Sequence, residues 1–363
     1  MKSIIITAAM AVACVASWAQ SYTVSGTINS EANGKTVYLT TRGQNDPAPV
    51  KHDSCVIANG QFTLKHATEV PELAFISIEK FSDSFVMEPG EVKVEATLGE
   101  ELKIVATGTK GNEGFAKYKQ AYASYVERLT PLRTQLQGGN LSAEQTDSLR
   151  KKWFEYQDVF YNGLDELCEA NYDNYLGMYL LPQLFSNWPL EKTAAYLEKV
   201  PENLRKVAHY EAIKNQIETL KRTAEGQPYT DIAGTSPDGQ QIKLSDLVAK
   251  NKLVLVDFWA TWCGPCMNEL PNVIKAYETY HAKGLEILGV SLDNKEDAWK
   301  STVKEKNMAW PQISDLKGWK CEAAAAYGVR AIPATVLIGQ DGKIIKRDLR
   351  GPELLKTLEE MLK

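Results

Sequence analysis

Hydrophobic and polar positions follow three successive patterns along the chain, and the first pattern is an alternation. Between residues 20 and 107, short runs such as Tyr22–Ile28 and Phe62–Leu64 alternate apolar and polar side chains, and Asn-Gly pairs such as Asn59-Gly60 separate them. A period of two is typical of strands with one buried face, and Asn-Gly favours the tight turns of hairpins. The pattern predicts a small β-sandwich domain over residues 20–107.

The second pattern is helical. After a Gly- and Thr-rich stretch, Thr107–Gly114, apolar residues recur every three or four positions. The clearest stripe consists of Leu149, Trp153, Tyr156, Phe160, Leu164 and Cys168. This spacing puts the stripe on one helix face, which favours a packed core over a ligand groove. Ser142 and Gln145 fit a capping box before the stripe, and we expect a helical segment over residues 108–225.

The third pattern alternates strands and helices. Leu253–Val256 is a continuous apolar run, as expected for a strand that is buried on both faces. Further strands are predicted at Leu285–Val290 and Thr335–Ile338, with helical stretches between them and a last helix from Pro352. The order predicts an α/β domain over residues 226–363, with an antiparallel return near its end.

The first nineteen residues have the features of a secretory signal peptide. Met1–Ser3 carries a positive charge, Ile4–Ala16 is apolar, and Ser17–Ala19 places small residues at a cleavage site. The alternatives are an N-terminal membrane anchor and a lipoprotein acylated at Cys14. The signal predicts a protein of the periplasm or cell envelope, with no transmembrane helix after residue 19, because no later apolar run reaches about 18 residues.

Composition excludes several classes of protein. The chain has 363 residues, of which 44% are hydrophobic, and its formal net charge is −5. An acidic chain lacks the concentrated positive charge that nucleic-acid binding requires. Six cysteines are too few for a disulfide scaffold. Four scattered histidines and a single paired-cysteine motif do not make a metal site.

The chemistry is expected at Trp262-Cys263-Gly264-Pro265-Cys266, directly after the buried strand. The N-terminus of a helix stabilises a thiolate, so Cys263 would be the nucleophile, partly exposed, and Cys266 the resolving cysteine one turn later. A c-type haem site needs His where the chain has Met267. A plain structural disulfide is the remaining alternative, and the strand–CxxC–helix order favours redox chemistry.

The residues of this region resemble a known family. Val256–Cys266 closely resembles thioredoxins, whereas Met267–Pro271 and Tyr327–Pro333 look like the TlpA/ResA branch of extracytoplasmic thiol–disulfide oxidoreductases. The resemblance covers residues 228–363 and implies a thioredoxin fold. More weakly, residues 21–107 resemble a β-rich domain of unknown function that often precedes TlpA-like domains.

The resemblance also implies roles for individual residues. Asp257 matches a buried carboxylate that accepts the proton of Cys266, and burial would raise its pKa toward neutrality. Thioredoxins usually pair this acid with a Lys on the next strand, but Leu285–Leu292 contains none. Glu269 matches an active-site Glu of the ResA-like branch. A solvated Asp257 and an ordinary surface Glu269 are the alternatives.

Three further residues are implied to bind substrate. Pro333 matches a cis-proline that faces the disulfide. It would leave the backbone of Ile332 free to pair with an extended substrate. Trp262 would provide a flat apolar rim beside the reactive pair.

Together these features predict an extracytoplasmic thiol–disulfide oxidoreductase that reduces protein disulfides, needs no cofactor and receives electrons from an unidentified envelope donor. The alternatives are a disulfide oxidase or isomerase, and a binding protein in which residues 20–225 recognise a partner. A thiol peroxidase is disfavoured, because Val256 and Ala260 stand where its motif has Pro and Thr. The pairing of three more cysteines stays open, with a Cys55–Cys168 bridge as one option; they are Cys55, Cys168 and Cys321.

Overall fold

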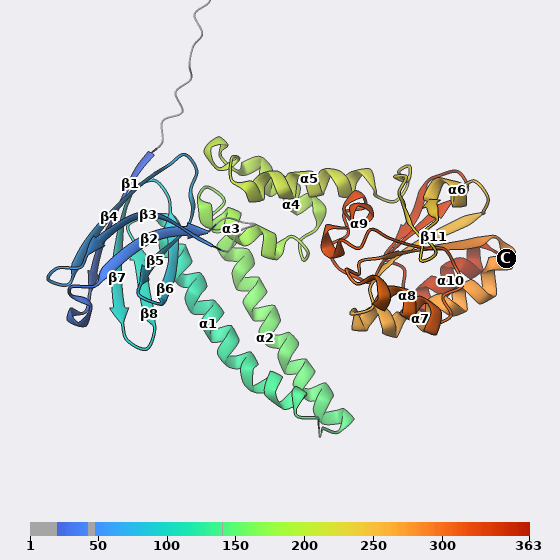
Figure 1. Cartoon of the computed structure of the whole chain (residues 1–363), viewed down its shortest axis with the longest axis horizontal. Coiled ribbons are helices and arrows are strands. Elements are labelled where there is room, and N and C mark those ends of the chain that lie inside the picture. The colour runs from blue at the N-terminus through green and yellow to red at the C-terminus, as the bar shows by residue number, and fades with distance from the viewer. Residues whose placement is uncertain (1–19, 43–47, 140) are drawn as a thin grey trace, which may run out of the picture. The chain divides into compact units, whose positions relative to one another are not determined.

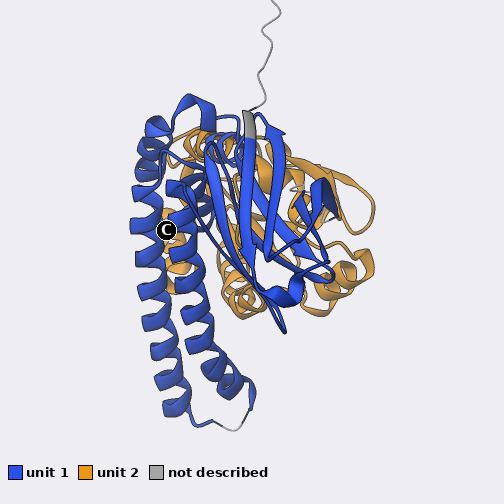
Figure 2. Cartoon of the chain, turned by 90° about the vertical axis from the view of Figure 1, so that its left-hand side faces the viewer, with its two compact units in different colours: residues 1–214 blue, residues 215–363 orange. Residues whose placement is uncertain are grey.

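The computed structural model describes residues 20–42, 48–139 and 141–363. The predicted signal peptide and Cys14 lie outside the described residues. The chain separates into two compact units, residues 1–214 and 215–363 (Figure 2). Among the described residues, no helix is long and apolar enough to cross a bilayer.

The first unit begins with two four-stranded sheets that share one hydrophobic core. Alternation produces this core: in β7 (Glu91–Leu98) every second residue is buried. One sheet has the order β4-β1-β7-β8 and the other β3-β2-β5-β6, which confirms the expected β-sandwich (Figure 1). The other strands are β1 (Gln20–Ile28), β2 (Thr36–Arg42), β3 (Pro49–Val56), β4 (Gln61–Thr68), β5 (Glu72–Ile78), β6 (Phe81–Met87) and β8 (Leu102–Thr107), with a 3-10 turn η1 (Ser30–Ala32).

Two long helices follow the sheets and run side by side as a hairpin (Figure 1). α1 (Lys110–Gln137) starts at the N-cap Thr109, and α2 (Ala143–Ala170) starts at the expected capping box of Ser142 and Gln145. Phe160, Leu164 and Cys168 of the predicted stripe are buried. The remaining elements are α3 (Tyr175–Leu184), α4 (Leu190–Lys199), η2 (Glu202–Leu204) and α5 (Ala208–Arg222).

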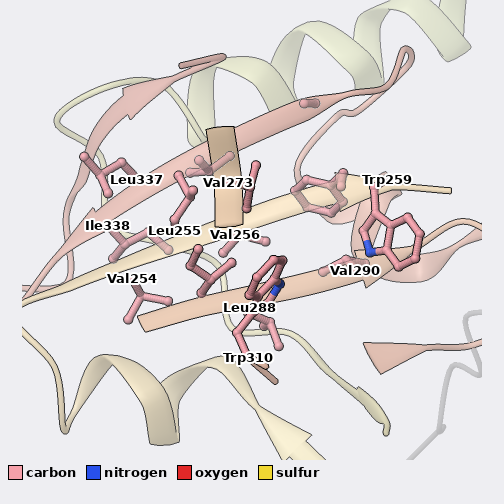
Figure 3. Packing of buried hydrophobic residues seen from close by; sticks show 14 of the residues in the cluster. Val254, Leu255, Val256, Trp259, Val273, Leu288, Val290, Trp310, Leu337 and Ile338 are labelled. Atoms are coloured by element: carbon pink, nitrogen blue, oxygen red, sulfur yellow. The ribbon is translucent and has the colours of Figure 1, made fainter. Parts of the chain in front are cut away.

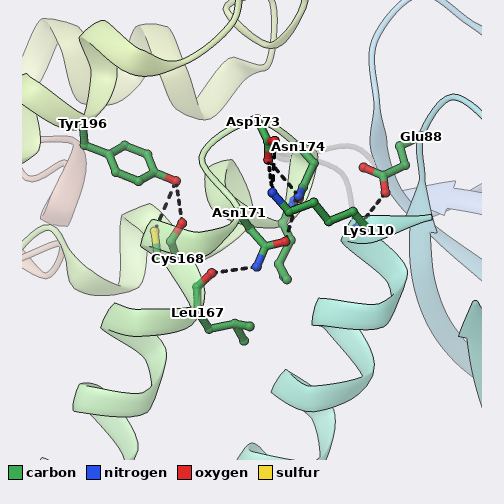
Figure 4. Close-up of polar contacts among 10 residues, drawn as sticks. Glu88, Lys110, Leu167, Cys168, Asn171, Asp173, Asn174 and Tyr196 are labelled. Atoms are coloured by element: carbon green, nitrogen blue, oxygen red, sulfur yellow. Dashed lines mark hydrogen bonds and ion pairs between the residues drawn. The ribbon is translucent and has the colours of Figure 1, made fainter.

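Buried polar contacts join the second sheet to the start of α1 (Figure 4). The carboxylate of Glu88 accepts a hydrogen bond of 2.7 Å from the backbone N–H of Gly111. A Cβ at this glycine would lie 2.4 Å from Glu88 Oε1, so a larger residue would displace the carboxylate from this hydrogen bond. A carboxylate here also satisfies a free N–H of the first helical turn and the positive end of the helix dipole. The contact fixes where the helical hairpin begins.

The second unit contains a seven-stranded sheet with the order β10-β9-β13-β12-β11-β14-β15. β11 (Leu253–Trp259) is buried along its whole length and lies parallel to β12 (Leu285–Ser291) and antiparallel to β14 (Ala334–Gly339). Apolar side chains of these three strands pack with Val273 and Trp310 (Figure 3). This is a thioredoxin fold, as the sequence predicts.

Helices and short strands complete this unit. α7 (Gly264–Tyr280) follows β11, and α10 (Gly351–Met361) ends the chain. The other elements are β9 (Ala233–Thr235), β10 (Gln241–Lys243), α6 (Leu244–Val248), η3 (His281–Lys283), α8 (Glu296–Glu305), β13 (Gln312–Ser314), η4 (Gly318–Lys320), α9 (Glu322–Ala326) and β15 (Ile344–Arg347). The buried central strand β11 therefore leads directly into the start of α7.

Candidate active site

The paired cysteines lie where β11 turns into α7. Cys263 is the N-cap of α7, and its Sγ accepts a hydrogen bond of 3.1 Å from the backbone N–H of Cys266. The two form a disulfide with an S–S distance of 2.01 Å and a Cα–Cα distance of 5.2 Å. A sulfur in this position faces the unpaired N–H groups and the positive dipole end of the helix, which favour a thiolate once the disulfide is reduced.

A buried aspartate that sequence reasoning missed fixes the turn before the cysteines. Asp293 is 1% exposed and accepts hydrogen bonds from the backbone N–H of Thr261, at 3.1 Å, and from its hydroxyl, at 2.6 Å. Ser291 donates a third, at 2.8 Å. The acid is 30 residues from Cys263 along the chain, so only the pairing of β12 with β11 brings the two segments together.

The two cysteines are almost equally buried. Cys263 is 5% exposed and Cys266 is 4% exposed, so the expectation of a partly exposed Cys263 is wrong for this oxidised form. A loop from a distant part of the sequence covers the sulfur: the carbonyl oxygen of Ile332 lies 3.6 Å from Cys263 Sγ. Trp262, the residue before Cys263, is by contrast 52% exposed.

The covering loop contains the predicted cis bond, between Ile332 and Pro333. Ile332 is half-buried, Pro333 is buried, and β14 starts at the next residue, Ala334. Because β14 pairs with β11, the loop is held against the start of α7. The structure thus brings Ile332 and Pro333 together with the cysteine pair.

Asp257 lies on β11, opposite Thr335 of β14, and is 5% exposed. Burial and, to a lesser degree, the negative charge of Glu269 raise the pKa of Asp257 to about 7, whereas the positive charge of Arg350 opposes this rise. The alternative of a solvated Asp257 is therefore wrong. The positive charge near Asp257 thus comes from the segment before α10 and not from a Lys on the neighbouring strand.

Glu269 and Arg350 join three segments around this acid. Glu269 accepts a hydrogen bond of 2.6 Å from the backbone N–H of Gly351 and another of 3.2 Å from the side chain of Asn272. The guanidinium of Arg350 donates to the carbonyl oxygen of Pro333. Glu269 is therefore part of this network and not an ordinary surface residue. No local signal in the sequence marks Arg350, because its partners are distant in the chain.

The other cysteines that the structure describes are free thiols: Cys55 is half-buried, and Cys168 and Cys321 are buried, so the Cys55–Cys168 bridge is not formed. Burial raises the pKa of Cys168 to about 12. Its Sγ lies 3.4 Å from the hydroxyl of Tyr196 (Figure 4), which fits the structural thiol that the helical stripe predicts. Among the described residues, no group of three or more His, Cys, Asp or Glu side chains is arranged to hold a metal ion.

Comparison with known proteins agrees with this geometry. Residues 226–347 match the AhpC/TSA family, and residues 22–115 match a domain of unknown function (DUF4369). The thiol-disulfide oxidoreductase ResA of Bacillus thuringiensis is 36% identical over 138 residues, which are 38% of this chain and 76% of that protein. ResA of Bacillus subtilis is 32% identical over 34% of this chain and 66% of its own length.

Solved structures include similar domains. The thioredoxin domain of a thiol-disulfide oxidoreductase from Bacteroides vulgatus is 33% identical, covers 39% of this chain and 99% of that domain, and has a TM-score of 0.36. A thiol-disulfide oxidoreductase from Bacteroides fragilis is 28% identical over 38% of this chain and its own full length, with a TM-score of 0.36.

The fold and the site define a thioredoxin-fold oxidoreductase with a disulfide-bonded cysteine pair at the start of a helix. The identity to ResA extends over three quarters of the length of one of these proteins, and this identifies the family within that class. The chain belongs to the ResA-like thiol–disulfide oxidoreductases, with a domain of unknown function in its N-terminal part.

The raised pKa of Asp257 predicts a pH-dependent stability. The unfolded carboxyl loses its proton near its ordinary pKa of 3.8 and the folded one near 7. The folded state therefore binds more protons between these values, and the free energy of unfolding falls as pH rises from about 4 to about 7. At about 1.4 kcal/mol per pKa unit, the full effect is about 4 kcal/mol. Asp257→Asn should remove this fall.

The measurement is urea unfolding of the oxidised protein and of the Asp257→Asn variant at pH values from 4 to 8. The difference between the two free energies of unfolding should grow with pH in favour of the variant, because other titrating groups cancel in the difference. A difference that stays constant across this range would contradict the raised pKa.

A second prediction concerns the charge of Arg350. Replacing Arg350 with Gln removes the positive charge that lowers the pKa of Asp257, so this pKa should move above about 7. The side-chain carboxyl signal of labelled Asp257, followed by NMR against pH, measures this directly. Arg350→Lys keeps the charge and is the control, with a smaller change expected. An unchanged titration in Arg350→Gln would show that Arg350 does not influence the acid.

Proposed function

We propose that the protein works outside the cytoplasm and reduces the disulfides of other proteins, with Cys263 as nucleophile and Cys266 as resolving cysteine. The observation that carries the proposal is the position of Cys263 at the N-cap of α7, with Cys266 Nα–H directed at its sulfur. The leader-like segment 1–19 supports the location. Thiol–disulfide exchange itself is the chemistry of the family.

In the first step, the reduced protein attacks. The thiolate of Cys263 attacks one sulfur of the substrate disulfide and forms a mixed disulfide. The substrate S–S bond breaks, and the other substrate sulfur leaves as a thiolate that takes a proton from solvent. In the reduced protein, the N-terminus of α7 stabilises the thiolate form of Cys263, which is the attacking form.

In the second step, Cys266 resolves the mixed disulfide. Asp257 accepts the proton of the Cys266 thiol, and the resulting thiolate attacks Cys263 Sγ. The second substrate sulfur leaves as a thiolate that takes a proton from solvent, Asp257 returns its proton to solvent, and the enzyme holds the Cys263–Cys266 disulfide. A carboxylate with a pKa of about 7 suits a general base near neutral pH. Glu269 either shares the proton transfer or holds the network through Gly351.

The substrate is proposed to bind as an extended segment beside the cis-proline loop. The carbonyl of Ile332 faces Cys263 Sγ at 3.6 Å, so a chain paired with this backbone lies next to the reacting sulfur. Pro333 shapes the loop, and the half-exposed Trp262 lines the other side. These residues would bind the segment around the substrate cysteine.

An external thiol donor must then reduce the enzyme disulfide, because each turnover consumes the two electrons of the Cys263/Cys266 dithiol. The dipeptide Gly264-Pro265 between the cysteines supports net reduction, since the same dipeptide occurs in thioredoxin, whose potential is about −270 mV. Strong disulfide oxidants lie at about −120 mV. The donor is expected to be another dithiol protein of the envelope.

The cysteine roles are tested by single substitutions. Cys263→Ser should reduce no disulfide substrate above background. Cys266→Ser should still attack but stop at the mixed disulfide, because no internal thiol releases the substrate. Mass spectrometry of the reaction products detects the trapped adduct on Cys263.

Cys55→Ser is the matched control, because Cys55 is the half-buried thiol of the other unit. It should turn over like the unmodified protein. A Cys263→Ser variant that traps the substrate on Cys266, together with a Cys266→Ser variant that forms no adduct, would reverse the proposed order of attack.

The proposed base is tested by single-turnover kinetics. Asp257→Asn should slow release of the substrate by about 10²-fold, the lower end for losing a general base, and leave the first attack nearly unchanged. In the unmodified protein, release should become faster as pH rises through about 7, because Asp257 acts when deprotonated. Rapid acid quench at each pH separates mixed disulfide from product.

Glu269→Gln is the comparison. If the rate of substrate release falls strongly in Glu269→Gln and stays unchanged in Asp257→Asn, Glu269 is the base. Equal losses of attack and release in Asp257→Asn would indicate damage to the fold instead.

A further inference from the structure

Two tryptophans form an exposed aromatic pair beside the disulfide. The rings of Trp262 and Trp319 lie 6.0 Å apart between centroids at an angle of 55°, and each residue is 52% exposed. In the described part of residues 215–363, Met361 is the other large hydrophobic residue that is exposed. The buried tryptophans of this unit are Trp259, Trp299 and Trp310. The exposed aromatic surface of the thioredoxin-fold unit is therefore concentrated at the reactive pair.

The chain holds Trp319 in place through its backbone. Trp319 lies in the short turn η4, which begins at Gly318; Leu316, just before the turn, and Gly318 have φ of 56° and 59°. The carboxylate of Asp315 accepts hydrogen bonds from the backbone N–H groups of Lys317, at 3.1 Å, and Glu322, at 2.9 Å, on either side of the turn. These two hydrogen bonds hold the backbone of the turn, while the indole of Trp319 stays half exposed to solvent.

A substrate attached to Cys263 must lie close to this pair. Trp262 is the residue before Cys263, and the Cα atoms of two cysteines in a disulfide are about 5.5–6 Å apart. An extended chain advances about 3.3–3.6 Å per residue. Side chains one or two positions from the substrate cysteine are therefore within reach of the indole rings.

We propose that Trp319, together with Trp262, binds a large apolar side chain located one or two residues from the reacting cysteine of the substrate. This inference rests on the proposed function and names its substrate class: extended or unfolded polypeptides, in which such side chains are accessible. The two indoles give a flat apolar surface, and aromatic contact adds to the free energy gained from burial. Trp319 thus acts on specificity and not on the exchange chemistry.

The experiment compares two disulfide-linked peptides that differ at one position beside the cysteine, Phe in one and Ser in the other. Bis(2-hydroxyethyl) disulfide serves as a third substrate with no side chains. The full chain and its Trp319→Ala variant are assayed for kcat and KM on all three. The unmodified protein should prefer the Phe peptide, and Trp319→Ala should raise KM for that peptide by about 10-fold, with the Ser peptide and the small disulfide nearly unchanged.

Two matched variants complete the design. Trp319→Phe keeps an aromatic ring and should retain most of the preference for the Phe peptide. Met361→Ala removes another exposed apolar side chain of the same unit, on α10, and should change nothing.

Equal losses on the Phe and Ser peptides, or a preference that survives in Trp319→Ala, would overturn the inference. So would a Trp319→Ala variant whose preference is intact but whose oligomeric state differs by sedimentation, because the pair would then be a contact between copies of the chain. Failure of the proposed function looks different: the unmodified protein would reduce none of the three disulfides.

Discussion

The site depends on one constraint: a strand buried on both faces ends where a helix begins. All seven residues of β11 are buried between β12 and β14, so the strand cannot shift without exposing apolar surface. The packing of the core therefore fixes the start of α7, and it fixes the position of Cys263 as well. A reactive sulfur at a helix N-terminus is stabilised by backbone groups whose direction the core sets, which makes its environment independent of flexible side chains.

The same buried strand also carries the acid that would serve the second cysteine. An ionised Asp257 is costly in this core, and the negative charge of Glu269 increases the cost. Arg350 supplies a compensating positive charge from the segment before α10, and its hydrogen bond to Pro333 connects that segment to the cis-proline loop. A pKa near 7 thus results from opposing contributions of three segments, and a change in any of them alters when the acid releases its proton.

Sequence patterns predicted the framework because the framework depends on local signals. The apolar run 253–256, the alternation in residues 20–107 and the Ser142–Gln145 capping box each reflect interactions within a few residues, and all three occur as predicted. The cysteine pair at a helix start was predicted from the strand–CxxC–helix order, whereas the cis bond before Pro333 was predicted from the family resemblance.

The features that sequence could not supply are contacts between distant segments. Arg350, Asp293 and Trp319 reach the site only through the pairing of strands that lie far apart in the chain. The low exposure of Cys263 has the same origin, because the residue that covers its sulfur is 69 positions away. Spacing within one helix predicts which face a residue occupies, but not what a loop from elsewhere places over it.

Low exposure of both sulfurs has a consequence for selectivity. A thiolate stabilised by a helix N-terminus reacts with many disulfides that reach it, so reactivity alone discriminates little between substrates. Discrimination must then come from the surfaces that a substrate crosses on the way to Cys263. In the proposed mechanism those surfaces include the backbone at Ile332, which lies against Cys263 Sγ, and the exposed indole of Trp262. A backbone pairs with any extended chain, whereas an indole distinguishes apolar from polar side chains, so the proposed selection of substrates depends on the aromatic side chains beside Cys263.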